Sequence, residues 1–117
     1  GARRAAYVHA KMMVVDDVWV TVGSCNLHPF SLAGHTEMNA SIWDAAVARD
    51  LRCRLFAQHL GVDTASLDDR AALRLFGDIA RANRLRMESR ASDWQGLTFA
   101  LSPETYATKS GVKPDLT

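Results

Sequence analysis

The sequence of 117 residues is poor in cysteine and lacks any long run of apolar residues. Its two cysteines, Cys25 and Cys53, provide no disulfide framework, and we expect both to be reduced. Because no apolar stretch approaches the ~18 residues that a membrane-spanning helix requires, we expect no transmembrane helix. The formal net charge of +1 argues against the broad basic surface of proteins that bind nucleic acid without specificity.

Sequence patterns of metal-dependent and nucleotide-binding enzymes are also absent. The chain has no H-E-x-x-H and no P-loop, and His28, His35 and His59 lack the paired cysteines or H-x3-H spacing of a zinc site. We therefore expect no metal site and no cofactor. His59 stands near the end of a predicted helix, where a histidine interacts with the helix dipole or packs against neighbours.

The residues that could carry chemistry are concentrated near the N-terminus. His9-Ala10-Lys11 is followed after four residues by Asp16, and then by Gly23-Ser24-Cys25-Asn26. These residues supply an imidazole, an ammonium, a carboxylate, a hydroxyl and an amide, which together can hold a phosphodiester and attack its phosphorus. A lysine inside an apolar strand also requires an anionic ligand or a carboxylate to offset the cost of its burial.

Local patterns place these residues on a β-hairpin. Apolar residues 7–15 predict a strand in which His9 and Lys11 share one face, about 7 Å apart. Asp16-Asp17 is typical of a tight turn, and residues 18–22 predict the returning strand. The hairpin would therefore bring residues 23–26 back towards His9, with Gly23 allowing the backbone to approach a phosphate.

A third strand is predicted over residues 36–43, and it carries Glu37. A nucleophilic or acid-base histidine needs its second ring nitrogen held by a third group, and Glu37 is the candidate for that group. The alternative is a solvated glutamate at a strand end.

Two helices are predicted after the third strand. Asp44 is a candidate N-cap for a helix that runs to Leu60 and stops at Gly61, with an apolar stripe at 47, 51 and 55. Residues 66–69 have capping-box character before a second helix that extends to about Arg86. Its apolar side would carry 72, 75, 76, 79 and 82, and its arginines at 81–86 a solvated face. Residues 97–101 could form a further short strand. These elements predict an α/β fold (α and β mixed), with a hairpin and a further strand in a mixed sheet followed by two flanking helices.

The spacing H-x-K-x4-D followed by G-S-x-N resembles the HKD signature of the phospholipase D superfamily. Residues 55–61, L-F-A-Q-H-L-G, are similar to the helix end that follows the second motif in many phospholipases D, and residues 26–32 are similar to the loop after the motif in cardiolipin synthases. The chain departs from these patterns at His28 and Phe30, which bears on substrate preference. The resemblance is most like the C-terminal half of a bacterial phospholipase D or cardiolipin synthase-like protein.

This resemblance implies roles for individual residues. His9 and Lys11 with Ser24 and Asn26 would bind the substrate phosphate, and Asp16 would support the site. Glu37 would hydrogen-bond the motif histidine. In the superfamily two copies of the motif act together: one histidine attacks phosphorus, and the other protonates the leaving alcohol. The role of His9 between these two stays open, with acid-base catalysis favoured if this is the C-terminal half.

Since the chain has one such motif, the second must come from elsewhere. The abrupt start at Gly1 favours a missing N-terminal half over a symmetric homodimer. We expect residues 1–107 to be the C-terminal portion of a phospholipase D-like catalytic domain with one motif, and residues 108–117 to be a disordered tail.

The function expected from this resemblance is phosphodiester hydrolysis or transphosphatidylation on phospholipids through a phosphohistidine. The expected partners are a phospholipid at a membrane surface and a second HKD-bearing half, without specific nucleic acid. A peripheral location, on the membrane or on its cytoplasmic side, would follow. The alternatives are a homodimeric, metal-independent nuclease of the same superfamily and a non-catalytic half-domain; near-neutral charge argues against the first.

Overall fold

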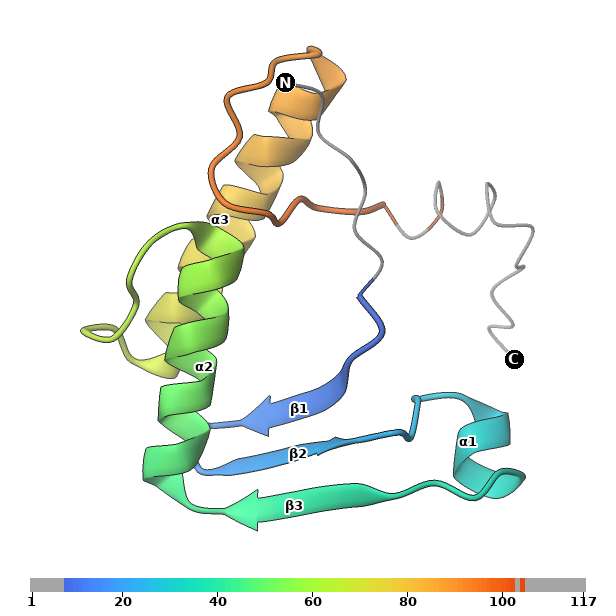
Figure 1. The fold of residues 1–117 in the computed structure, drawn as a ribbon. Helices are drawn as coiled ribbons and strands as arrows, with labels where there is room; N and C mark the ends of the chain where they lie inside the picture. The colour runs from blue at the N-terminus through green and yellow to red at the C-terminus, as the bar shows by residue number, and fades with distance from the viewer. Residues whose placement is uncertain (1–7, 103, 105–117) are drawn as a thin grey trace.

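The computed structural model describes residues 8–102 and 104 and has a mixed α and β architecture, as the sequence predicts (Figure 1). Strands β1 (Lys11–Val15), β2 (Trp19–Gly23) and β3 (Asn39–Trp43) form a sheet in the order β1-β2-β3. Both strand pairings are antiparallel, whereas a mixed sheet was expected. Helices α2 (Ala45–Leu60) and α3 (Asp69–Glu88) follow, and a short helix α1 (Pro29–Ala33) connects β2 to β3.

β1 and β3 are shorter than their sequence patterns predict, and β2 has the predicted length but lies one residue later in the chain. β1 begins at Lys11, so His9 lies just before the strand, and the predicted start at Tyr7 falls outside the described residues. The β1–β2 turn is built as expected by Asp16 and Asp17, whose φ angles are 50° and 51°. Aspartate tolerates this left-handed region better than most residues, which explains why the pair can close the turn.

The first long helix agrees with the prediction at both ends. The Asp44 side chain accepts hydrogen bonds from the backbone N–H groups of Ala46 and Val47, and Gly61 ends the helix with a φ of 67°. The buried stripe differs, because α2 buries Ala48, Arg52 and Leu60 while Val47 is exposed. The expected stripe therefore lies one residue away from the buried one.

α3 is predicted nearly to its observed end, but its start is different. The N-cap is Asp68, whose side chain accepts from the N–H of Ala71, so the predicted capping box at residues 66–69 is wrong. α3 packs against α2 through Phe76 and Phe56, whose ring centroids lie 5.1 Å apart. Its buried residues are Ala72, Ile79, Ala80 and Asn83.

The short strand predicted at residues 97–101 is wrong. The backbone N–H of Leu97 donates to the carbonyl of His59, and that of Ala100 donates to the carbonyl of Ala80. The buried Asn83 also bonds the backbone of Gln95 and the carbonyl of Thr98. This segment therefore satisfies its backbone groups on the two helices and not in a sheet. The predicted tail at residues 108–117 lies outside the described residues.

The arrangement gives the sheet two unlike ends. Figure 1 shows α2 beside the β1–β2 turn and α1 at the opposite end of the sheet. The core under the sheet is centred on Val20 of β2 and Ala48 of α2, whose side chains are almost fully buried. Among the described helices, none is long and apolar enough to cross a membrane.

Candidate active site

The strand register brings the predicted site residues to the end of the sheet that carries α1. Lys11 pairs with Gly23, and Gly23 in turn pairs with Asn39. The start of β1, the exit of β2 and the entry of β3 are therefore side by side. Residues 9–11, 23–26 and 37–39 meet there, although the sequence separates them by up to thirty positions.

Lys11 is half-buried at the start of β1, and its Nζ donates a hydrogen bond to the backbone carbonyl of His9 at 2.8 Å. His9 is exposed directly before the strand. The contact joins the lysine to the histidine backbone, and it keeps the two residues close at the same sheet end. The ammonium retains two further N–H donors for an anion.

Ser24 links the exit of β2 to the entry of β3. Its Oγ donates to Glu37 Oε2 at 2.5 Å and accepts from the backbone N–H of Met38 at 3.0 Å. The Ser24 N–H also donates to the carbonyl of Met38 at 3.0 Å. Ser24 is exposed, so its hydroxyl is accessible to a ligand while its backbone is fixed.

Glu37 is ionised at neutral pH. Hydrogen bonds from the hydroxyls of Ser24 and then Ser31 lower the pKa of its carboxyl group below the ordinary value. The positive charges of His35 and Lys11 act in the same direction with smaller effect. The Glu37 carboxylate therefore lies within electrostatic reach of Lys11. Its predicted hydrogen bond to His9 stays a prediction.

Gly23 is required by close packing at this end. A Cβ on Gly23 would clash with Asn39 Oδ1 and with the carbonyl oxygen of Met38. Asn39 Oδ1 in turn accepts from the N–H of Cys25 at 3.2 Å, which fixes the loop just before Asn26. The Asn26 amide donates to Ser31 Oγ at 3.5 Å. Glycine therefore serves here because the neighbouring strand leaves no room for a side chain.

Asp16 is the predicted site residue that the hairpin does not bring to this end. It is exposed in the β1–β2 turn, beyond the pair Val15 and Trp19, while Lys11 lies at the other end of the strand. Five strand residues at about 3.3 Å each place it roughly 17 Å from Lys11. Any support that Asp16 gives the site would have to be transmitted through the hairpin.

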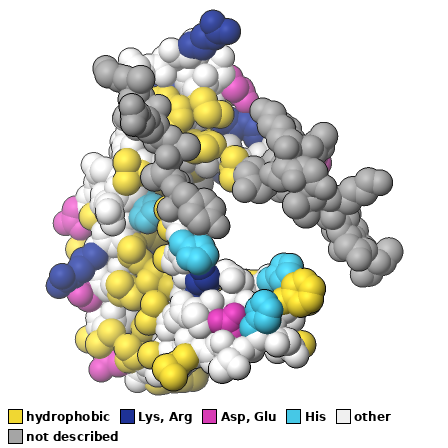
Figure 2. All heavy atoms as spheres, turned by 45° about the vertical axis from the view of Figure 1, so that its right-hand side comes forward, with side chains coloured by type: hydrophobic (Ala, Val, Ile, Leu, Met, Phe, Trp, Pro, Cys, Tyr) yellow, Lys and Arg dark blue, Asp and Glu magenta, His cyan; other side chains and the backbone are white. Residues whose placement is uncertain are grey.

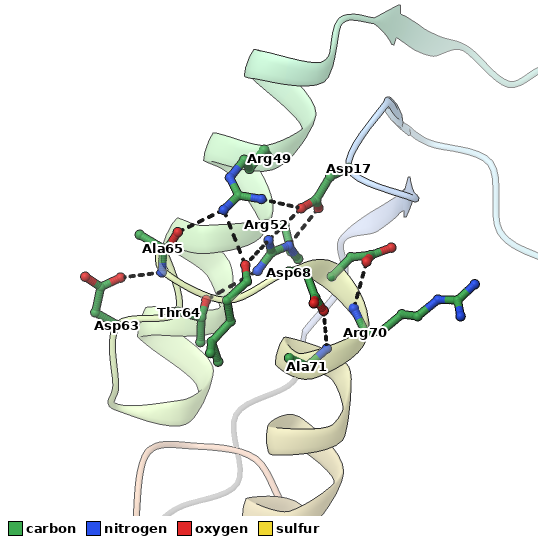
Figure 3. Close-up of polar contacts among 11 residues, drawn as sticks. Asp17, Arg49, Arg52, Asp63, Thr64, Ala65, Asp68, Arg70 and Ala71 are labelled. Carbon is green, nitrogen blue, oxygen red and sulfur yellow. Dashed lines mark hydrogen bonds and ion pairs between the residues drawn. The ribbon is translucent and has the colours of Figure 1, made fainter.

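The neighbouring Asp17 anchors the turn to α2 (Figure 3). Its two carboxylate oxygens accept from Arg52, with Nε–Oδ1 at 2.7 Å and Nη2–Oδ2 at 2.5 Å, and Arg49 approaches at 3.4 Å. The Arg52 side chain is 4% exposed and also bonds Thr64 Oγ1 and the carbonyl of Leu67. The hydrogen bonds from Arg52 hold the pKa of Asp17 below its ordinary value. We call Asp17, Arg49 and Arg52 the turn clasp.

Aromatic and apolar side chains border the site around α1. The Phe30 ring stacks with the rings of His28 and His35, at centroid distances of 5.3 Å and 5.8 Å. Figure 2 turns the α1 side of the molecule forward and shows histidine, basic and acidic side chains gathered around a hollow on that face. A surface of this kind suits the anion site that we predict from Lys11, Ser24 and Asn26.

Sequence reasoning missed α1, Ser31 and the turn clasp. Asp17 and Arg52 are 35 positions apart, and neither residue type nor spacing identifies such a pair. The signal that could have identified Ser31 is the resemblance of residues 26–32 to the loop after the motif, in which Ser31 had been given no role. Within the part of the chain that the structure describes, no group of three or more His, Cys, Asp and Glu side chains could hold a metal ion.

Comparison with known proteins identifies the family of this chain. Residues 2–59 match the family model described as cardiolipin synthase, PLD-like domain. The chain is similar to phospholipase D zeta 2 of Arabidopsis thaliana, with 32% identity over 78 residues that cover 52% of this chain and 8% of that protein. It is 44% identical to cardiolipin synthase B of Escherichia coli over 48 residues, which cover 41% of this chain and 12% of the relative.

These relatives are much longer than the segment that they share with this chain, which spans about a tenth of their length. No solved structure gives a significant match. The matched residues 2–59 contain the H-x-K-x4-D and G-S-x-N segments, the strands that bring most of them together and Glu37. The chain belongs to the phospholipase D superfamily.

Proposed function

We propose that this chain supplies half of a catalytic site that hydrolyses a phospholipid phosphodiester or transfers its phosphatidyl group to an alcohol. The proposal is supported by the sheet end to which the register brings Lys11 and Ser24, where Ser24 bonds the ionised Glu37 and Lys11 bonds the backbone of His9. Cationic and neutral donors at one position stabilise the negative charge that grows on a phosphoryl group during displacement. The relatives named phospholipase D and cardiolipin synthase support this substrate class.

The chemistry needs two imidazoles. One histidine nitrogen forms a bond to phosphorus as the P–O bond to the first alcohol breaks, and the second histidine gives a proton to that leaving oxygen. Water or a second alcohol, deprotonated by the same second histidine, then attacks phosphorus, and the P–N bond breaks. His9 supplies one of the two imidazoles, and we assign it the acid-base role.

The other imidazole would come from a second HKD-bearing half, within the same native polypeptide or from a partner chain. In this proposal residues 1–107 are the C-terminal portion of the catalytic domain, and the substrate is reached at a membrane surface. Lys11, Ser24 and Asn26 bind the phosphoryl oxygens, while Glu37 orients the groups around them. Lys11 provides positive charge, and Ser24 and Asn26 provide hydrogen-bond donors to the phosphoryl oxygens.

The test uses the native polypeptide that contains this chain, assayed on phosphatidylglycerol and phosphatidylcholine vesicles. His9→Asn should reduce turnover by roughly 10³-fold or more, because a group that transfers a proton or attacks phosphorus is removed. His59→Asn is the matched control: His59 lies at the end of α2, 6.4 Å from the Phe76 ring, and its variant should retain turnover.

Two results would point elsewhere. An active His9→Asn enzyme would end the proposal. Cleavage of single-stranded DNA, together with a solution mass of two chains and no lipid turnover, would favour the homodimeric nuclease of the same superfamily.

A further inference from the structure

Helix α1 exposes its large apolar side chains and buries its serine, which is the opposite of the usual packing of a short helix. Its two large apolar side chains, Phe30 and Leu32, are each 65% exposed, whereas Ser31 between them is 8% exposed. A short helix normally buries its apolar residues and leaves serine in solvent. Burial of a hydroxyl is unfavourable unless it is hydrogen-bonded, so the reversed packing points to a specific role for Ser31.

The contacts of Ser31 lie on the loop of the candidate site. The Asn26 amide donates to Ser31 Oγ at 3.5 Å, and the Cys25 thiol donates to the Ser31 carbonyl at 3.9 Å. The Ser31 hydroxyl also lowers the pKa of the Glu37 carboxyl group, after the larger effect of Ser24. A hydroxyl can accept and donate at once, so one side chain can serve both neighbours.

We propose that Ser31 is a positioning residue of the phosphate site, whose buried hydroxyl accepts a hydrogen bond from the Asn26 amide. Ser31 therefore ties the loop that leaves β2 to helix α1. It fixes the direction of the Asn26 amide, whose second N–H is then available to a phosphoryl oxygen. This inference rests on the proposed function only in that the site binds a phosphoryl group.

The caps at both ends of α1 hold this hydroxyl in place. Its N-terminus is held by the His28 ring, which accepts from the N–H of Phe30 at 3.3 Å, and Pro29 occupies the first helical turn. Its end is closed by the N–H of Gly34, which donates to the carbonyl of Phe30 at 2.9 Å. A five-residue helix capped in this way sets the serine at a fixed position between the two strand ends.

The experiment measures affinity for inorganic phosphate by calorimetry in the native polypeptide, with Ser31→Ala, Ser31→Thr and Ser41→Ala compared to the parent. Ser31→Ala should weaken phosphate binding about tenfold, the effect of one hydrogen bond within a charged site. Ser31→Thr, which keeps the hydroxyl, should restore most of the affinity. Ser41→Ala removes a β3 hydroxyl that bonds Thr21 and should leave phosphate affinity unchanged.

A second readout separates positioning from packing. In Ser31→Ala the Glu37 carboxyl, followed by carbon NMR, should titrate at higher pH than in the parent, and Ser31→Thr should return it towards the parent value. Parent-like phosphate affinity and parent-like Glu37 titration in Ser31→Ala would overturn the inference. If the parent binds phosphate and responds as expected but turns over no phospholipid, the proposed function fails while the role of Ser31 stands.

Discussion

The charged side chains at the two ends of the β1–β2 hairpin differ in their burial and in their partners. At the turn end, the Asp17 carboxylate pairs with both Arg52 and Arg49, and the Arg52 side chain is almost fully buried. At the α1 end, Lys11 bonds a backbone carbonyl, and Ser24 bonds Glu37 at an exposed position. The Arg52 side chain of the turn clasp is almost inaccessible to solvent, whereas Ser24 at the α1 end is exposed and Glu37 is half-buried, so a ligand can reach Ser24.

This difference indicates a division of labour along a strand five residues long. A buried ion pair with several hydrogen bonds is strongly destabilising to break, which suits a fixed anchor. Exposed polar groups contribute little to stability and can change partners when a ligand arrives. The clasp holds the hairpin against α2, and the free end of the hairpin then presents Lys11 and Ser24 in register.

The largest expected effect on stability separates the two aspartates of the turn. Asp17→Asn should lower the free energy of unfolding by about 3 kcal/mol, because it leaves the buried Arg52 without its counter-charge. Asp16→Asn is the matched control, since Asp16 is exposed and has nearly the same φ angle, so both variants keep a residue that tolerates that conformation. Urea unfolding followed by circular dichroism measures both.

Equal losses in the two variants would contradict the distinction between anchor and site. They would mean that the Asp17–Arg52 ion pair contributes no more to stability than the exposed Asp16 carboxylate does. A loss in Asp16→Asn alone would make Asp16 the structural aspartate of the motif.

Glu37→Gln should have the reverse signature, with a small effect on stability and a larger one on turnover. We expect kcat in the native polypeptide to fall about 100-fold, the lower range for loss of a group that orients proton transfer, while the free energy of unfolding stays close to that of the parent. Glu88→Gln, which loses an exposed ion pair with Arg84 on α3, is the control. Unchanged turnover and pH profile would remove Glu37 from the mechanism.

Acid should weaken the anchor in a defined direction. The pKa of Asp17 is lowered in the folded protein from an ordinary value of 3.8, so below about pH 4 the unfolded chain takes up this proton before the folded protein does. The stability that Asp17 contributes is therefore present above its ordinary pKa and is lost as pH falls towards the folded pKa. Asp17→Asn should flatten this part of the stability curve; an unchanged slope would contradict the assignment.

Sequence patterns predicted the parts of this fold that local contacts determine. The Asp44 cap and Gly61 stop of α2 act within one helical turn, and the Asp16-Asp17 turn is closed by the conformational preferences of its own residues. Residue types and spacing also identified His9, Lys11, Ser24 and Asn26 as a candidate phosphate site. The register of the strands brings Lys11 and Ser24 to one sheet end because hairpin pairing is itself local.

The parts that sequence patterns missed depend on distant partners. Residues 97–101 have a strand-like pattern, but the backbone N–H groups of Leu97 and Ala100 bond to carbonyls of α2 and α3. Arg52 has the position of an ordinary surface residue in the helical pattern, and only the arrival of Asp17 from the hairpin explains its burial. α1 was missed because a helix of five residues is too short to show a helical period in its apolar residues.

The most direct test of the account is a titration of the native polypeptide with inorganic phosphate, followed by backbone amide NMR. The account predicts that phosphate shifts the amides of residues 9–11, 23–26 and 37 and leaves those of Asp16 and Asp17 unchanged. Shifts concentrated at the turn, or confined to a surface away from Lys11 and Ser24, would contradict it.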